Sequence, residues 1–150
     1  MIPAPLKLSL ADALRAARET RALEIGGNIL TETPRLFGAH FNGQAAVIVA
    51  DEHTFRVAGR TVQEAFLAAG RAVRAPLILR APDLYAESRF VAEVEAALRE
   101  HPAIPVAVGS GTINDLTKLA AHRTGRTYLC VATAASMDGY TAFGASITHE

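Results

Sequence analysis

The residues of this 150-residue chain that could do chemistry gather in two short segments near its carboxyl end. In the first, an apolar run closes in a glycine turn, Gly109-Ser110-Gly111-Thr112, directly before a helical pattern. Two glycines let the backbone approach a ligand, and the first free N–H groups of a helix attract an anion such as a pyrophosphate. Thr112 and Asp115 also fit a capping box. A turn and a helix cap without any ligand therefore explain this segment about equally well.

This glycine turn departs in two ways from the common dinucleotide-binding fingerprint. Asn114 stands where the third glycine is expected, and no acidic residue follows at a distance suited to a ribose. The best candidate is Asp51, far upstream at the end of another apolar run. Its carboxylate could receive the adenosine-ribose hydroxyls and would then favour NAD over NADP. A solvated strand-end aspartate or a helix-entry residue would give the same pattern.

The second segment, residues 133–141, combines hydroxyl groups, a carboxylate and a glycine in the sequence TAASMDGYT. It directly follows an apolar run, so we expect it at the carboxyl edge of a sheet, beside the glycine turn. Open α/β sheets bind their ligands at that edge. An ordinary polar loop has a similar composition, and Lys118, two turns into the helical pattern, is expected to face water or the sheet edge rather than a phosphate.

The elements that would position both segments alternate between strand and helix. Buried strands are predicted at 45–51, 76–80, 104–109 and 127–133, with helices at 60–73, 87–99 and 112–122. Ahead of them, Ser9 and Asp12 approximate a capping box, and a strand at 22–25 and a helix at 29–38 are expected. This rhythm predicts an α/β fold for residues 1–150: a Rossmann-like, doubly wound and mostly parallel sheet with flanking helices.

Composition narrows the classes of partner. Fifteen basic residues balance fifteen acidic ones, which argues against a nucleic-acid partner. The apolar runs are far shorter than the roughly 20 residues that span a bilayer, and the amino terminus does not resemble a signal peptide. We therefore expect a cytoplasmic protein with a small-molecule substrate and no membrane partner. The oligomeric state is left open, with a homo-oligomer as one option, and the lone Cys130 is expected in the core.

Together these segments resemble the sn-glycerol-1-phosphate dehydrogenase family, within the superfamily of iron-type alcohol dehydrogenases, glycerol dehydrogenase and 3-dehydroquinate synthase. GSGTINDLTK resembles the family's phosphate-binding turn, TAASMDGYTA its nucleotide- and substrate-contacting loop, and ADEHT its ribose-binding strand end. Their order and spacing fit, and the resemblance covers nearly the whole chain.

The resemblance implies NAD or NADP as cofactor. Its pyrophosphate would lie against Gly109, Ser110, Gly111, Thr112 and Ile113. Thr133 and Ser136 would touch the cofactor, and Asp138 would face the substrate hydroxyls. The family often has a serine four residues after that aspartate, where this chain has Ala142.

The resemblance also implies a divalent metal, zinc, nickel or iron, held by a helical carboxyl-terminal domain that this chain does not reach. None of the five histidines pairs at a ligand spacing. We therefore expect a dinucleotide-binding domain truncated before its metal site, without catalytic residues of its own and inactive in isolation. The implied reaction interconverts dihydroxyacetone phosphate and sn-glycerol 1-phosphate. A glycerol or polyol dehydrogenase and a non-catalytic nucleotide-binding module are the alternatives.

Overall fold

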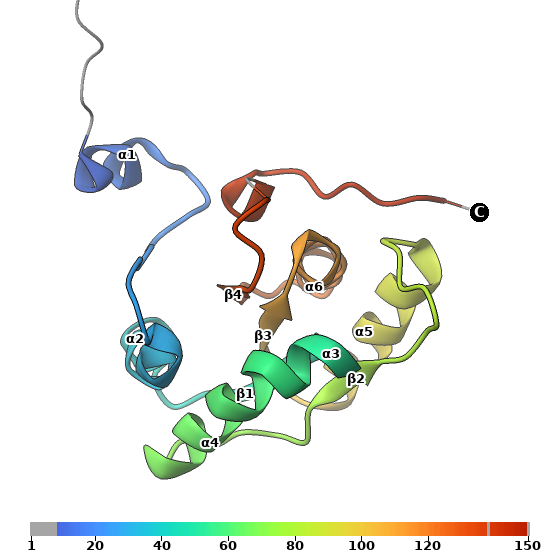
Figure 1. The fold of residues 1–150 in the computed structure, drawn as a ribbon, viewed down its shortest axis with the longest axis horizontal. Coiled ribbons are helices and arrows are strands. Elements are labelled where there is room, and N and C mark those ends of the chain that lie inside the picture. Colours follow the sequence, from blue (N-terminus) through green and yellow to red (C-terminus); the bar gives the residue numbers. More distant parts are fainter. Residues whose placement is uncertain (1–8, 138, 150) are drawn as a thin grey trace, which may run out of the picture.

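A four-stranded parallel sheet lies at the centre of the molecule, with helices on both faces (Figure 1). The computed structural model describes residues 9–137 and 139–149. The strands are β1 (Ala45–Asp51), β2 (Leu77–Leu79), β3 (Ala103–Gly109) and β4 (Leu129–Ala132), in the order β2-β1-β3-β4. The helices are α1 (Leu10–Ala16), α2 (Thr33–His40), α3 (Glu52–Thr54), α4 (Arg60–Ala68), α5 (Ser88–Glu100) and α6 (Gly111–Arg123). The predicted fold class is confirmed.

Alternation along the strands divides the core between the two faces of the sheet. Ile48 and Val106 point to one face, where they pack with Phe37 of α2 and Phe66 of α4. On the other face, Val49 and Ala107 pack against α5 and α6. Because both faces are covered, β3 is apolar throughout and β1 is apolar up to its last residue, Asp51, as expected of parallel strands buried on two sides.

Several predicted elements keep their type but change their bounds. The helix predicted at 60–73 ends at Ala68, because the chain turns at Gly70 in the left-handed region (φ 64°). It begins at Arg60 as predicted, and α3 and a π-helical turn at Phe55–Gly59 lead directly into it. The capping box at the start of α1 is confirmed, with Asp12 N–H donating to Ser9 Oγ and Ser9 N–H donating to Asp12 Oδ2.

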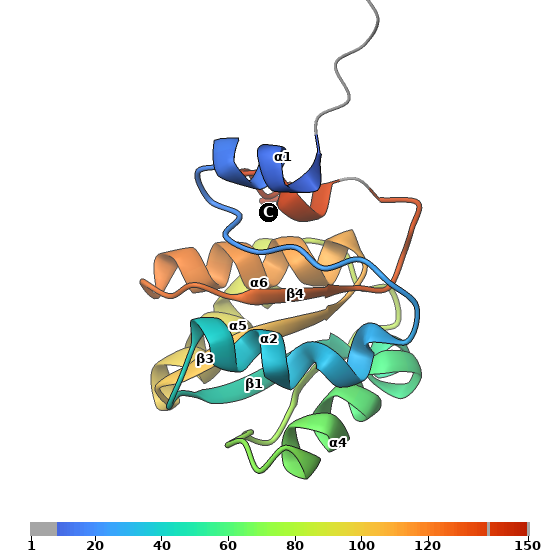
Figure 2. The ribbon, with the colours of Figure 1, turned by 90° about the vertical axis from the view of Figure 1, so that its left-hand side faces the viewer.

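Two predictions about the sheet are wrong. Residues 22–25 form no strand, because no strand of the described residues pairs with them. They lie across a hollow from β4, and Figure 2 shows this part of the chain running past that strand. β4 was predicted to be buried, but Leu129, Cys130 and Val131 are only half-buried. The reason is that β4 is an edge strand with one face turned to the hollow.

No helix in residues 9–137 and 139–149 is long and apolar enough to cross a membrane.

Candidate functional site

The predicted site residues meet at one edge of the sheet, where three neighbouring strands end. Gly109 closes β3 and pairs with Ala132 of β4, and the N–H of Thr133 donates to the Gly109 carbonyl at 3.1 Å. On the other side of β3, Val49 pairs with Ala107. Asp51 and Gly109, each two residues further on, therefore stand side by side at the ends of β1 and β3. The fold thus brings the ribose candidate, the glycine turn and the second segment to one edge.

The amino terminus of α6 is open. Ser110 is the N-cap residue, but its side chain makes no capping hydrogen bond, and the first bond of the helix is from Asn114 N–H to the Ser110 carbonyl at 3.0 Å. The N–H groups of Gly111, Thr112 and Ile113 consequently have no partner within the helix. They add to the positive end of a 13-residue helix dipole. This end of α6 is suited to an anion.

The capping box proposed for Thr112 and Asp115 does not form. Ser110, not Thr112, occupies the cap position. The Asp115 carboxylate accepts hydrogen bonds from Ser146 N–H (3.1 Å) and from the Asn114 side-chain amide (3.3 Å) instead. The helix cap that would have explained the glycine turn without a ligand is therefore not present.

Close packing explains the first glycine of the turn. A Cβ atom built on Gly109 would lie 2.6 Å from both Cβ and Cγ1 of Ile113. Ile113 is fully buried, so its side chain is not available to the pyrophosphate predicted beside it. A Cβ on Gly111 would meet the Met137 methyl at 2.5 Å, which shows that the second segment packs directly on the glycine turn.

Asp51 has a structural role that the sequence left as an alternative. Its Oδ1 accepts from Thr54 N–H at 2.7 Å, and Thr54 Oγ1 accepts from Asp51 N–H at 3.1 Å, so the residue caps α3. Its Oδ2 makes no hydrogen bond within the described residues. A ribose contact through this second oxygen remains a prediction.

The second segment is held by a residue to which sequence reasoning gave no role. The Tyr140 hydroxyl donates to the Ala134 carbonyl at 3.1 Å, accepts from Ala134 N–H at 3.3 Å and lies 3.5 Å from the Gly109 carbonyl. Burial raises the pKa of this phenol, so it stays protonated and able to donate. Thr133 and Ser136 are exposed beside the glycine turn. Asp138, the predicted substrate contact, lies outside the described residues.

Lys118 is bonded to a nearby loop and does not face water, one of the two surroundings predicted for it. Its ammonium donates to the carbonyls of Gly139 (3.4 Å), Ala142 (2.8 Å) and Gly144 (3.0 Å). The side chain is only 12% exposed. Ala142, which replaces the serine frequent in the family, thus contributes its carbonyl to a structural bond. No local sequence signal could reveal these partners, because they lie 21 to 26 residues away.

The family of this chain follows from its similarity to known proteins. The model of the iron-containing alcohol dehydrogenases matches residues 24–150. This chain belongs to the iron-containing alcohol dehydrogenase family. A glycerol-1-phosphate dehydrogenase [NAD(P)+] of Halalkalibacterium halodurans is 30% identical over 135 residues, which cover 88% of this chain and 33% of that protein. The chain therefore spans about a third of the length of this curated relative.

Solved structures of other proteins share the fold. A probable glycerol dehydrogenase from Sinorhizobium meliloti superimposes with a TM-score of 0.59 at 20% identity, covering 74% of this chain and 28% of that one. A 2-epi-5-epi-valiolone synthase from Streptomyces hygroscopicus, solved with NAD+ and Zn2+ bound, gives a TM-score of 0.56 at 20% identity, covering 77% and 34%. At these identities the likeness concerns the fold alone.

The described part of this family member offers no metal site. Within residues 9–137 and 139–149, no three His, Cys, Asp or Glu side chains lie close enough together to hold an ion. These residues consequently do not fit the divalent metal that the resemblance implies.

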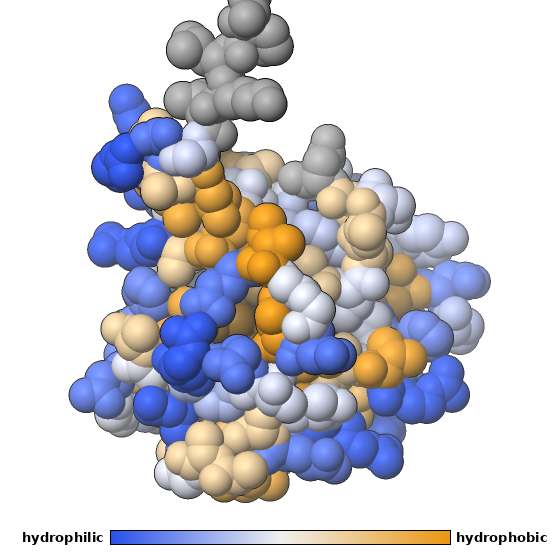
Figure 3. All heavy atoms as spheres, turned by 60° about the vertical axis from the view of Figure 1, so that its left-hand side comes forward, coloured by the Kyte–Doolittle hydropathy of each residue, from blue (hydrophilic) through white to orange (hydrophobic). Residues whose placement is uncertain are grey.

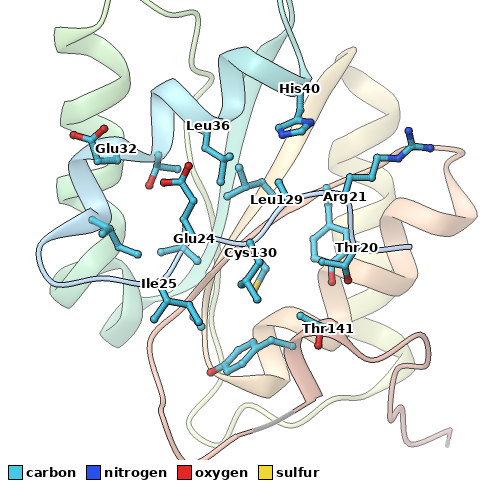
Figure 4. Close-up of a pocket in the computed structure, with 18 of the residues that line it drawn as sticks. Thr20, Arg21, Glu24, Ile25, Glu32, Leu36, His40, Leu129, Cys130 and Thr141 are labelled. Atoms are coloured by element: carbon cyan, nitrogen blue, oxygen red, sulfur yellow. The ribbon is translucent and has the colours of Figure 1, made fainter. Parts of the chain in front are cut away.

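The hollow beside β4, of about 810 Å3, lies between β4, α2 and the segment that follows α1 (Figure 4). Leu36, Leu129 and Cys130 point into it, with Glu24 and Glu32 near its rim. Figure 3 shows apolar atoms exposed among charged residues on this side of the molecule. None of the predicted nucleotide contacts lines the hollow. Cys130, which was expected in the core, is half-buried beside the hollow, and burial raises the pKa of its thiol to about 12, which argues against a nucleophile.

Proposed function

We propose that this chain is the NAD(P)-binding part of a metal-dependent oxidoreductase that interconverts dihydroxyacetone phosphate and sn-glycerol 1-phosphate. The observation that carries the proposal is the open amino terminus of α6, set behind a tightly packed glycine turn and beside the second segment. The choice of substrate is based on the relative of 30% identity, which is named a glycerol-1-phosphate dehydrogenase [NAD(P)+].

In this proposal the backbone supplies the pyrophosphate contacts. The free N–H groups of residues 111–113 would donate to the phosphate oxygens, and the helix dipole would favour their charge. The uncommitted Oδ2 of Asp51 would accept from the adenosine ribose, while Thr133 and Ser136 would contact the cofactor from the second segment. When bound, the nicotinamide supplies the chemistry by taking or giving a hydride.

In this proposal the described residues would bind and orient the cofactor. Asp138 would face the substrate hydroxyls. The metal ligands would come from outside residues 9–137 and 139–149, because the described residues do not gather a ligand set. We therefore expect the 150-residue chain to bind dinucleotide without turning over substrate.

Equilibrium binding and a paired activity assay test this proposal. Titration of the 150-residue chain with NADH and with NADPH is expected to show saturable binding. Oxidation of either cofactor with dihydroxyacetone phosphate is expected to be absent from this chain, with zinc, nickel or iron added. A longer product of the same reading frame, carrying whatever follows Glu150, is assayed beside it, with dihydroxyacetone and small polyol substrates as controls.

Each outcome has a definite meaning. Absence of dinucleotide binding would overturn the proposed function. Turnover by the 150-residue chain would overturn its role as a binding part only. Activity with glycerol or another unphosphorylated polyol, in preference to the phosphate ester, would replace the proposed substrate with that of a polyol dehydrogenase.

A further inference from the structure

One helix both forms the candidate phosphate site and fastens the loop beside it. Helix α6 begins at the glycine turn, and one to two turns later its side chains bind the backbone of residues 139–146. Lys118 makes three hydrogen bonds to carbonyls there, and its ammonium lies 3.7 Å from Asp115 Oδ1. Asp115 Oδ2 in turn accepts from Ser146 N–H at 3.1 Å. The Lys118 ammonium thus holds this loop through backbone carbonyls. The Asp115 carboxylate, on the same helix, holds it through a backbone N–H group.

A partly buried chain of hydrogen bonds orients the acidic member of this pair. The Tyr128 hydroxyl donates to the Asn114 side-chain carbonyl at 3.0 Å, and the Asn114 amide donates to Asp115 Oδ1 at 3.3 Å. Asn114 is only 1% exposed, and burial raises the pKa of Tyr128, which keeps its proton available. The asparagine that stands in place of a third glycine therefore has a positive role, because it orients Asp115.

We propose that Asp115 and Lys118 are positioning residues for the nicotinamide half of the cofactor. This inference rests on the proposed function and deepens it. By holding residues 139–146 on α6, the pair keeps Thr133 and Ser136 beside the open helix terminus, together with the Tyr140 contact to residue 134. These two residues follow β4, on the side of β3 opposite to Asp51, so a dinucleotide with its adenosine ribose at Asp51 would bring its nicotinamide half to them. The pyrophosphate contacts come from the backbone of α6 itself and do not depend on the pair. Loss of the pair should therefore weaken binding of the whole dinucleotide more than binding of its ADP half.

The test compares NADH with ADP on the 150-residue chain by calorimetric titration. Lys118→Met removes the ammonium and keeps most of the apolar stem, and Asp115→Ala removes the carboxylate. Each variant is expected to weaken NADH binding by about 10-fold, the scale of one charge-assisted hydrogen bond, and ADP binding by less than about 2-fold. Arg99→Met is the matched control, since it removes a cation paired with Glu95 on α5, away from this loop. It should leave both affinities unchanged.

Hydrogen exchange supplies a second readout that needs no ligand. The Ser146 amide, which donates to Asp115, should exchange faster in both Lys118→Met and Asp115→Ala than in the native chain and in Arg99→Met. Equal losses of NADH and ADP affinity, or unchanged NADH affinity with faster Ser146 exchange, would overturn the positioning role and leave the proposed function standing. If the native chain bound neither NADH nor ADP, the proposed function itself would fail, and this inference with it.

Discussion

Gly109 at the end of β3 and Ile113 in the first turn of α6 pack so closely that a Cβ on the glycine would lie 2.6 Å from the isoleucine Cβ. Both residues are buried. The contact fixes how near the helix start comes to the strand, and therefore where the free N–H groups of α6 lie. Packing and the candidate anion site are linked through this pair.

Gly109→Ala should destabilise the chain and also weaken dinucleotide binding. The added methyl group must push α6 away from β3, and overpacking of this kind costs typically 1–3 kcal/mol. Urea unfolding measures the loss. Gly27→Ala is the control, because a Cβ there meets nothing within 4 Å, and it should stay within about 0.5 kcal/mol of the native chain. Equal stability of the two variants would contradict the packing role.

Asp51→Asn should separate capping from ribose recognition. Asparagine caps a helix about as well as aspartate, so the free energy of unfolding should hardly change. Removal of the charge should weaken NADH binding while easing acceptance of the 2′-phosphate of NADPH, which shifts the ratio of the two dissociation constants toward NADPH. An unchanged ratio would show that Asp51 serves only as the cap of α3.

Tyr140→Phe should loosen the second segment without disturbing the sheet. The variant deletes a hydroxyl that bonds both the N–H and the carbonyl of Ala134, at a cost of about 1 kcal/mol. NADH affinity should fall, while ADP affinity is retained. Tyr85→Phe serves as the control, since Tyr85 is exposed. Retained NADH affinity in Tyr140→Phe would rule out a role for this contact in cofactor binding.

Cys130 should resist alkylation in the folded chain. Burial raises its pKa from 9.0 to about 12, so at pH 8 the reactive thiolate is scarcer than in the unfolded chain, by at least about 100-fold. Iodoacetamide should react slowly in buffer and quickly in urea. The same shift works against folding as pH rises from about 9 toward 12, because the unfolded thiol ionises first. Rapid alkylation of the folded chain at pH 8 would contradict the raised pKa of this thiol.

The sequence by itself determined the features that depend on short-range pattern. The apolar run at 45–51 is a strand with those same bounds, because burial on both faces demands continuous apolar residues. The helix predicted at 87–99 is observed at Ser88–Glu100, since its 3.6-residue periodicity is local. The glycine turn could be recognised as the start of a helix for the same reason.

Only the tertiary structure decided the features that depend on distant partners. Lys118 donates to carbonyls that lie 21 to 26 residues further along the chain. Sequence periodicity indicates contacts only between residues a few positions apart, so it could not predict these bonds. Residues 22–25 have the composition of a strand, but a strand needs a neighbour to satisfy its backbone, and the described residues provide none. The exposure of β4 likewise follows from its place at the edge of the sheet, which is set by strand order and not by the apolar residues of the strand itself.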